Sequence, residues 1–171
     1  MTQAPVETPT HSGYQPPRNV QFSVFIDNRV GQLLDVTQCF TGQSLTLAGL
    51  SVVDSADHAV VRLLTSNADL TRRLLQRHDI PFAESNVLAV EISEGRSLQD
   101  LCEQCVAAEV NILFAYPLLV RPRGLPVLVL QTDDTLFTAQ LLRKKLFTLL
   151  AENDLGDNAS RNRPEGGITP N

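Results

Sequence analysis

The chain has 171 residues, of which 43% are hydrophobic and 19% are charged, and its formal net charge is −5. This acidic balance argues against a nucleic-acid partner or an anionic membrane surface, because binding to phosphate groups requires a dense basic patch. Three cysteines are too few for a disulfide framework, and neither a signal peptide nor an apolar run of about 20 residues that could cross a bilayer is recognisable. We therefore expect a cytoplasmic protein of one or two small domains.

Both ends of the chain differ in composition from the middle. Residues 1–19 contain four of the ten prolines, mixed with Thr, Gln and Ser, and residues 154–171 are rich in Gly and Asn. Segments of this kind bury too little apolar surface to offset the entropy that is lost on ordering. We predict that both segments are disordered tails around a folded middle.

Six elements are predicted in the first half of the middle region. Their order is strand, helix, strand, strand, helix, strand, and they are expected at residues 22–26, 33–40, 45–53, 59–64, 66–77 and 82–86. The strands are indicated by apolar runs that are rich in β-branched residues. The helices are indicated by apolar residues at a helical spacing and, for the second helix, by Ser66 with Asp69 at the capping distance.

The same order of elements recurs about 66 residues further along the chain. The matching apolar positions of the two first strands are Phe22, Val24 and Ile26, and Leu88, Val90 and Ile92. The later elements of the second half are expected at residues 97–106, 112–120, 127–130, 133–144 and 146–151. Ser97 and Asp100 have the spacing of a capping box at the first of these helices. Self-similarity at a fixed period predicts two copies of one supersecondary unit.

Each unit, residues 20–86 and 87–153, therefore has the order β-α-β-β-α-β. With right-handed crossovers, this order places both helices on one face of a four-stranded antiparallel sheet. The predicted fold class is α+β, with two ferredoxin-like units in tandem that pack side by side, because a unit of this size is marginally stable alone. We expect the second strands of the two units to pair and so to cover each other's edges.

The loop after the first strand carries a motif that continues into the helix. The motif consists of Asp27, Asn28, Arg29, Val30, Gly31, Gln32 and Leu33. It is similar to the (E/D)NRPG-x-L segment of ACT domains, the small ligand-sensing modules of amino-acid metabolism, with Val30 in place of the usual proline. Together with the doubled pattern of strands and helices, the chain resembles a tandem pair of ACT domains over about residues 20–153.

The resemblance implies that a free amino acid binds between two units. In the phosphoglycerate dehydrogenase branch of the family, an Asn of this loop and an Asn at the start of the second strand of the facing unit hold the ligand. Carried over to this chain, the loop residue is Asn28 of the first unit and the strand residue is Asn111 of the second. The reverse combination would use Ser44 and Glu94 at these positions. One composite site therefore keeps both Asn residues and the other keeps neither.

The chemistry of these residues suits an amino acid. Gly31 at the helix start lets a ligand approach the backbone, where the first N–H groups of the helix could meet its carboxylate. An Asn amide both donates and accepts hydrogen bonds, and Asp27 could meet the α-ammonium group. The alternative is an ordinary surface turn, in which Asn and Gly are common. The implied ligand-binding residues are Asp27, Asn28, Arg29, Val30, Gly31, Gln32, Leu33, Asn111 and Ile112.

The other candidate sites favour packing or solvent exposure. Cys102 and Cys105 form a Cys-x-x-Cys pattern, but both fall on the apolar face of a predicted helix, which favours packing over a redox or zinc site. The three histidines, His11, His58 and His78, have no metal-ligand spacing. No catalytic constellation or phosphate-binding loop is recognisable in the sequence. We expect no metal, no cofactor and no catalytic residue.

These observations favour a stand-alone regulatory protein that senses a free amino acid. We expect it to be a homodimer whose ligand changes its action on a regulated enzyme or another protein. Two alternatives remain open. The first is a structural or protein-interaction adaptor of the same fold without a ligand, and the second is a small enzyme on a ferredoxin-like scaffold.

Overall fold

The structure is a computed structural model, and it describes residues 15–55 and 58–156. The elements in chain order are β1 (Asn19–Asp27), α1 (Gln32–Gln38), β2 (Leu47–Ser55), β3 (His58–Thr65), α2 (Ala68–Arg77), β4 (Phe82–Glu91), α3 (Leu98–Ala107), β5 (Ile112–Pro117), β6 (Val127–Thr132), α4 (Thr135–Lys144), β7 (Thr148–Leu150) and the 3-10 helix η1 (Glu152–Asp154). The predicted fold class is confirmed, because these elements form two β-α-β-β-α-β units in tandem.

The two units share one strand, β4. The strand order is β2-β3-β1-β4-β6-β5, with β7 also paired to β4, and the pairs are antiparallel. The first half of β4 pairs with β1, and its second half, from Leu88 onward, pairs with β6 and β7. The strands predicted at 82–86 and 88–92 are therefore one continuous strand. The expected unit boundary between residues 86 and 87 lies inside it.

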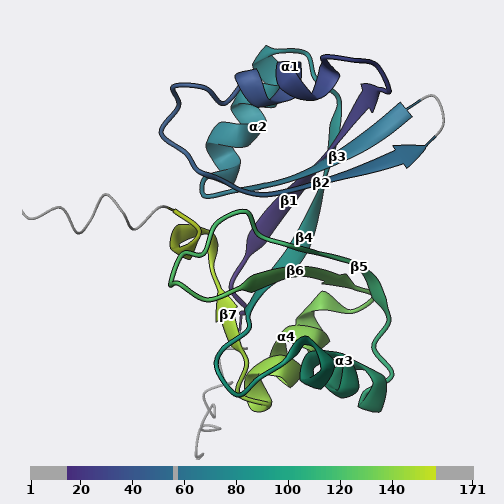
Figure 1. Ribbon diagram of the computed structural model, residues 1–171, viewed down its shortest axis with the longest axis vertical. Helices are drawn as coiled ribbons and strands as arrows, with labels where there is room; N and C mark the ends of the chain where they lie inside the picture. The colour runs from purple at the N-terminus through teal and green to yellow at the C-terminus, as the bar shows by residue number, and fades with distance from the viewer. Residues whose placement is uncertain (1–14, 56–57, 157–171) are drawn as a thin grey trace, which may run out of the picture.

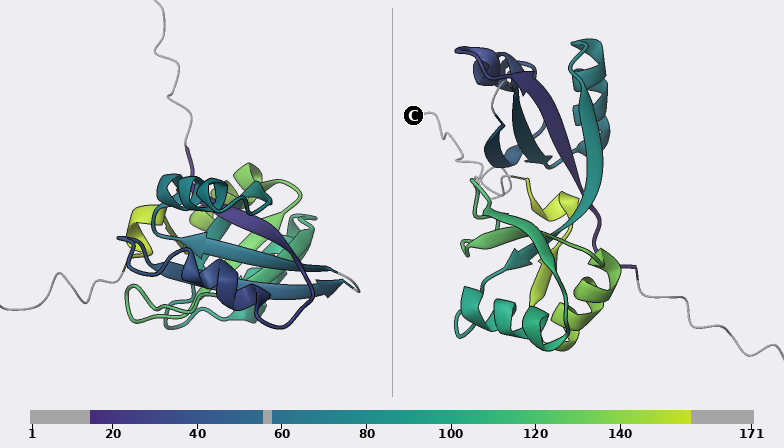
Figure 2. Two further views of the ribbon diagram at one scale, coloured as in Figure 1. Left: turned by 90° about the horizontal axis from the view of Figure 1, so that it is seen from above. Right: turned by 90° about the vertical axis from the view of Figure 1, so that its right-hand side faces the viewer.

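The helices cover the outer faces of the two sheets (Figures 1 and 2). Figure 1 shows α1 and α2 at one end of the molecule and α3 and α4 at the other, with the strands between them. Each pair of helices packs over its own apolar cluster, one around Phe22 and Leu75 and the other around Leu101 and Leu142. A third cluster joins residues of both sheets, including Leu64 of β3 and Val129 of β6. The units therefore pack through their sheet faces.

The expected pairing of the second strands occurs at one point only. Gly49 of β2 forms a single antiparallel bridge with Leu118, just after β5, and Leu119 N donates to Ala48 O over 2.8 Å. A Cβ atom at Gly49 would lie 2.9 Å from Leu118 Cδ2 and 3.2 Å from Tyr116 Cε2. A side chain at this position would require Leu118 and its neighbours to shift, so glycine permits the close approach of the two units.

Hydrogen bonds at the helix starts repeat between the units. Thr65 and Thr71 hydroxyls lie 2.7 Å apart in the first unit, and Thr132 and Thr138 hydroxyls lie 2.8 Å apart in the second. The residue that caps α2 is Asn67, whose Oδ1 accepts from Leu70 N, and not the predicted Ser66. The corresponding cap of α4 is Asp134, and the capping box of Ser97 and Asp100 on α3 is formed as predicted. The internal repeat thus extends to individual hydrogen bonds.

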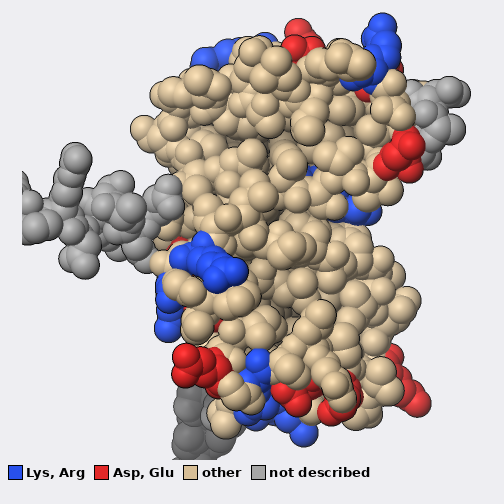
Figure 3. All heavy atoms as spheres, in the orientation of Figure 1, with Lys and Arg blue, Asp and Glu red and all other residues tan. Residues whose placement is uncertain are grey.

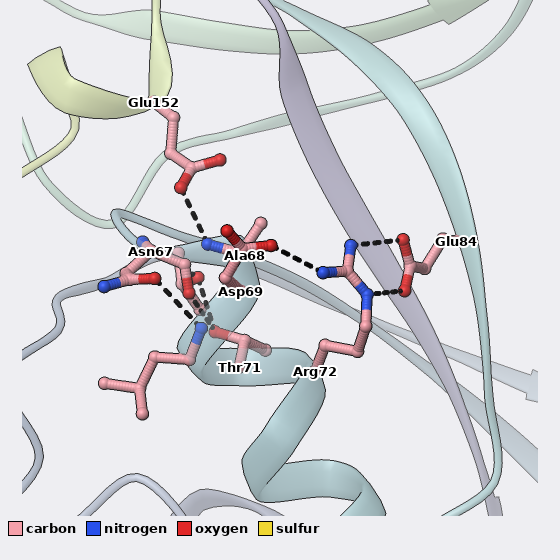
Figure 4. Close-up of polar contacts among 9 residues, drawn as sticks. Asn67, Ala68, Asp69, Thr71, Arg72, Glu84 and Glu152 are labelled. Carbon is pink, nitrogen blue, oxygen red and sulfur yellow. Dashed lines mark hydrogen bonds and ion pairs between the residues drawn. The ribbon is translucent and has the colours of Figure 1, made fainter.

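The predicted tails are shorter than expected where the structure describes them. Asn19 is buried and begins β1, although it was placed in the N-terminal tail. Leu155, placed in the C-terminal tail, is fully buried in the cluster between the sheets. Just before it, Glu152 Oε1 accepts a hydrogen bond of 2.7 Å from Ala68 N at the start of α2 (Figure 4). The remaining parts of both predicted tails, residues 1–14 and 157–171, lie outside the described residues.

Candidate functional site

The motif loop follows β1 and leads into α1. Gly31 is the N-cap residue of α1, with φ of 96° and ψ of −23° in the left-handed region, which favours glycine. A Cβ atom built on Gly31 would have no other heavy atom within 4 Å among the described residues. The glycine is therefore explained by backbone conformation, and it also leaves the backbone beside it open. Helix α1 has only seven residues, so its dipole is short.

The polar side chains of the loop already make contacts within the chain. Arg29 forms an ion pair with Asp27. Asn28 Nδ2 donates to Asp54 Oδ1 of β2 over 2.8 Å, and Gln32 Nε2 donates to Asp35 Oδ2 over 3.4 Å. An ammonium group that binds to Asp27 would therefore share it with Arg29.

A hollow of about 320 Å³ lies beside this loop. Its lining residues are Phe25, Ile26, Asp27, Gln32, Asp35, Val36, Asp79, Ile80 and Pro81. Two predicted residues, Asp27 and Gln32, take part in it. Sequence reasoning missed the other two acidic residues of the lining, Asp35 and Asp79, which make the lining net acidic. Asp79 could have been found from the topology, since the end of β1 and the start of β4 must be neighbours in a β-α-β-β-α-β unit.

In the second unit, apolar and basic residues stand at positions that correspond to the acidic hollow of the first. Leu146, with φ of 64°, matches Asp79, with φ of 52°, at the end of the preceding helix. The next residue, Phe147, is buried, and the guanidinium of Arg96 lies 5.1 Å from the centre of its ring. Arg96 belongs to the loop that is equivalent to the motif loop. The acidic hollow is thus a property of the first unit.

The structure does not bring the two predicted halves of the composite site together within one chain. Asn111 precedes β5, where its backbone N donates to Asp133 Oδ1 over 3.1 Å, and Ile112 packs against the cluster under α3 and α4. Figure 1 shows this junction of α3 and β5 in the lower half of the molecule, whereas the loop between β1 and α1 lies at the upper end. The pairing of Asn28 with Asn111 therefore stays a prediction, and within one chain the two residues lie in different units.

Several motif side chains point to solvent. Val30 is fully exposed, Leu34 is 59% exposed and Leu33 is 38% exposed. Neither Val30 nor Leu33 lines the hollow. Val30 lies in the loop, and Leu33 and Leu34 lie in the first turn of α1. Exposed apolar side chains that form a contiguous patch are typical of a surface that another molecule covers.

The cysteines of the Cys-x-x-Cys pattern lie on α3. Cys105 is buried in the cluster beneath this helix, and Cys102 is partly exposed. Burial, with a smaller effect of Cys102, raises the pKa of the Cys105 thiol, which makes it a poor nucleophile. Within residues 15–55 and 58–156, no group of three or more His, Cys, Asp and Glu side chains could hold a metal ion.

Comparison with known proteins identifies the family. A family model described as an ACT domain pair matches residues 19–159. The chain belongs to the ACT domain pair family. The search of curated proteins returned no match. The motif loop of this ACT pair and both of its units lie within the matched range.

Solved structures resemble this ACT pair in fold. Protein BT0572 from Bacteroides thetaiotaomicron shares 22% identity and a TM-score of 0.71, over 82% of this chain and 96% of that one. The ligand-free regulatory subunit of aspartate kinase from Thermus thermophilus shares 7% identity and a TM-score of 0.49, over 75% of this chain and 93% of that one. At 22% identity the likeness to protein BT0572 concerns the fold alone.

Two surface properties of the ACT pair bear on its partners. Among the described residues, no helix is both long enough and apolar enough to span a bilayer. On the face drawn in Figure 3, charged side chains of both signs lie in small groups, mostly toward the ends and the rim, and the surface between them is largely uncharged. The described residues visible on that face form no continuous basic surface of the kind that phosphate backbones bind.

Proposed function

We propose that this ACT domain pair is a regulatory sensor that binds a free amino acid in the hollow beside loop 27–31 of the first unit. The observation that carries the proposal is the hollow itself, which is lined by Asp27 and Gln32 of the family's motif and by two further carboxylates. Its volume of about 320 Å³ lies at the lower end of the range of small-molecule sites, about 300–1,000 Å³.

The charges of the hollow orient the ligand. One or more of the carboxylates of Asp27, Asp35 and Asp79 would receive the α-ammonium group, because acidic residues in the lining favour a cation. Arg29, which is paired with Asp27, is the nearest cation of the motif and would then turn to the ligand carboxylate. Asp79 follows α2 and Asp27 ends β1, so the ligand would join two segments that are far apart in sequence.

A second copy of the chain would complete the site in this proposal. The exposed Val30 and Leu34 supply an apolar surface for it to cover. The segment that holds Asn111 would then come from the partner, which preserves the family's pairing of two Asn residues across an interface. Ligand binding would in this way change the assembly of the protein and its action on a regulated partner.

The test is a thermal-shift screen of the purified chain against the twenty amino acids. A ligand at 100 times its Kd adds about 2.7 kcal/mol to the free energy of unfolding, and sedimentation with and without that ligand reports the assembly. Asp79→Asn removes a charge and keeps a residue that tolerates a positive φ. Glu109→Asn is the matched control, since Glu109 has φ of 56° after α3 in the other unit.

We expect Asp79→Asn to raise at least tenfold the ligand concentration that gives half of the maximal thermal shift. Glu109→Asn should leave this concentration unchanged. Equal effects of both variants would place the ligand elsewhere. If no amino acid stabilises the chain, the protein is an adaptor that has kept the fold without the ligand, and the sensor proposal is abandoned.

A further inference from the structure

The connection between β5 and β6 is long and contacts both units. β5 ends at Pro117 and β6 begins at Val127, so the connection, which we call the strap, consists of residues 118–126. The corresponding connection of the first unit, between β2 and β3, consists of residues 56–57 alone. The strap lies at the boundary between the two units (Figures 1 and 2). It is therefore a feature of the second unit that the first unit lacks.

The start of the strap is attached to the first unit. Leu119 N donates to Ala48 O of β2 over 2.8 Å, and Leu118 forms an isolated bridge with Gly49. Leu118 and Val120 also pack against the apolar cluster between the two sheets. The strap is thus part of the joint between the units.

A buried carboxylate lies near the turn of the strap. Glu91 is the last residue of β4 and is 3% exposed. Val87 and Ala89 belong to the cluster between the sheets, and because side chains alternate along a strand, Glu91 faces the same side. Its Oε2 lies 3.6 Å from Arg123 Nε of the strap but accepts no hydrogen bond among the described residues. Glu91 is therefore a buried charge that is paired loosely with the strap, through a side chain that is itself 53% exposed.

The internal repeat shows that the fold does not require a charge at this position. Phe25 of β1 is the equivalent of Glu91, since Phe22 matches Leu88, and Phe25 is 45% exposed. The chain thus has an aromatic side chain where the position is half-exposed and a carboxylate where the position is buried. Burial alone favours the opposite arrangement, because an apolar side chain gains free energy on leaving water and a charge loses it. The charge of Glu91 therefore weakens the packing of the strap.

We propose that the strap is a releasable clamp on the joint between the two units, and that the buried charge of Glu91 eases its release. While the strap is docked, Arg123 offsets only part of the cost of removing the carboxylate from water, because an ion pair without a hydrogen bond gains little. When the strap is released, water reaches Glu91. The charge of Glu91 thus favours release, and the charge of Arg123 favours docking. Release breaks the hydrogen bond from Leu119 to β2, so the units can change their relative position while β4 and the cluster between the sheets still join them.

Native-state hydrogen exchange of the full chain tests the proposal. The Leu119 amide reports release of the strap, because it donates to β2 while the strap is docked. The amides of β1 report global unfolding, because β1 is paired on both sides. We expect the Leu119 amide to exchange roughly tenfold faster than these amides or more. Its exchange should depend little on low urea concentrations, because release exposes little surface.

Substitutions at the two members of the ion pair should act in opposite directions. Glu91→Met removes the charge and keeps a side chain of similar length, so it should slow exchange at Leu119 about tenfold. Arg123→Met leaves the carboxylate buried without its cation, so it should speed this exchange about tenfold. The same change made together with Glu91→Met should have no further effect, because no buried charge is left to offset. Arg121→Met, at an exposed position of the same strap, is the matched control and should leave the exchange unchanged.

Several outcomes would overturn the proposal. If Leu119 and the amides of β1 exchange at one rate with one urea dependence, the strap opens only when the chain unfolds. If Glu91→Met and Arg123→Met both speed the exchange, the pair is an ordinary stabilising ion pair, and if neither changes it, the pair has no part in docking. An equal effect of Arg121→Met and Arg123→Met would assign the effect to net charge. Because no ligand is added, none of these results bears on the sensor proposal, and the two proposals fail separately.

Discussion

A substitution at Leu155 tests whether the segment after β7 stabilises the packing of the two units. Its side chain is fully buried in the cluster between the two sheets, although it lies after the last strand in a polar stretch of sequence. Replacing a fully buried leucine by alanine costs about 2–5 kcal/mol, from lost burial and the cavity left behind. Against a total stability of about 5–15 kcal/mol for a domain, Leu155→Ala removes a large fraction.

The assay is equilibrium unfolding in urea, followed by circular dichroism. With a slope of about 2 kcal/mol/M, the expected loss lowers the unfolding midpoint by roughly 1–2.5 M. Leu119→Ala is the control, because that side chain is 61% exposed and its removal should have little effect. Equal midpoints for the two variants would refute the reasoning that the segment after β7 is part of the core.

Three further predictions concern the contacts between and within the units. Tyr116→Phe removes the hydroxyl that donates to Gln21 Oε1 over 2.8 Å, and the oxygen left unsatisfied should cost about 1–3 kcal/mol in urea unfolding; unchanged stability would contradict this. Gly49→Ala places a Cβ atom 2.9 Å from a side-chain atom of the other unit, and we expect the free energy of unfolding to fall by about 1–3 kcal/mol. An unchanged free energy of unfolding would show that the neighbouring side chains can move aside. Arg72 holds the pKa of Glu84 below its usual value of 4.5 through their hydrogen bonds (Figure 4). The pair therefore stabilises the folded state above pH 4.5, and this contribution is lost as the pH falls through the lowered pKa. Glu84→Gln should therefore lower Tm at pH 7 and have a decreasing effect below pH 4.5; a pH-independent difference would contradict it.

The duplicated fold was predictable because its signals are local. Apolar periodicity, the cap spacing at Ser97 and the match of Phe22 with Leu88 each depend on a few neighbouring residues. The cap of α2 was misplaced by one residue, because Ser66 and Asn67 are both good caps and tertiary contacts decide between them. The merging of two strands into β4 was not predictable, since an uninterrupted strand and two abutting strands have the same alternation of apolar residues.

The candidate site was predictable only in part. The loop with Asp27 could be found from its motif, but the pairing with Asn111 depends on how the two units face each other, which no local pattern encodes. The place of Leu155 was missed for a related reason. A single leucine in a polar stretch gives no periodic signal, and its burial follows from the space left between two sheets.

The shared strand also limits how the two units can be separated. A chain cut between residues 86 and 87 would lose only the pair of Asn19 and Val87 from the ladders, because residues 82–86 pair with β1 and residues 88–91 pair with β6 and β7. Each half would, however, expose its side of the apolar cluster between the sheets, with Leu64 in the first half and Val129 in the second, and an exposed apolar patch of this kind favours aggregation. The two units are therefore held together as one folding unit by the cluster between their sheets rather than by the hydrogen bonds of the shared strand.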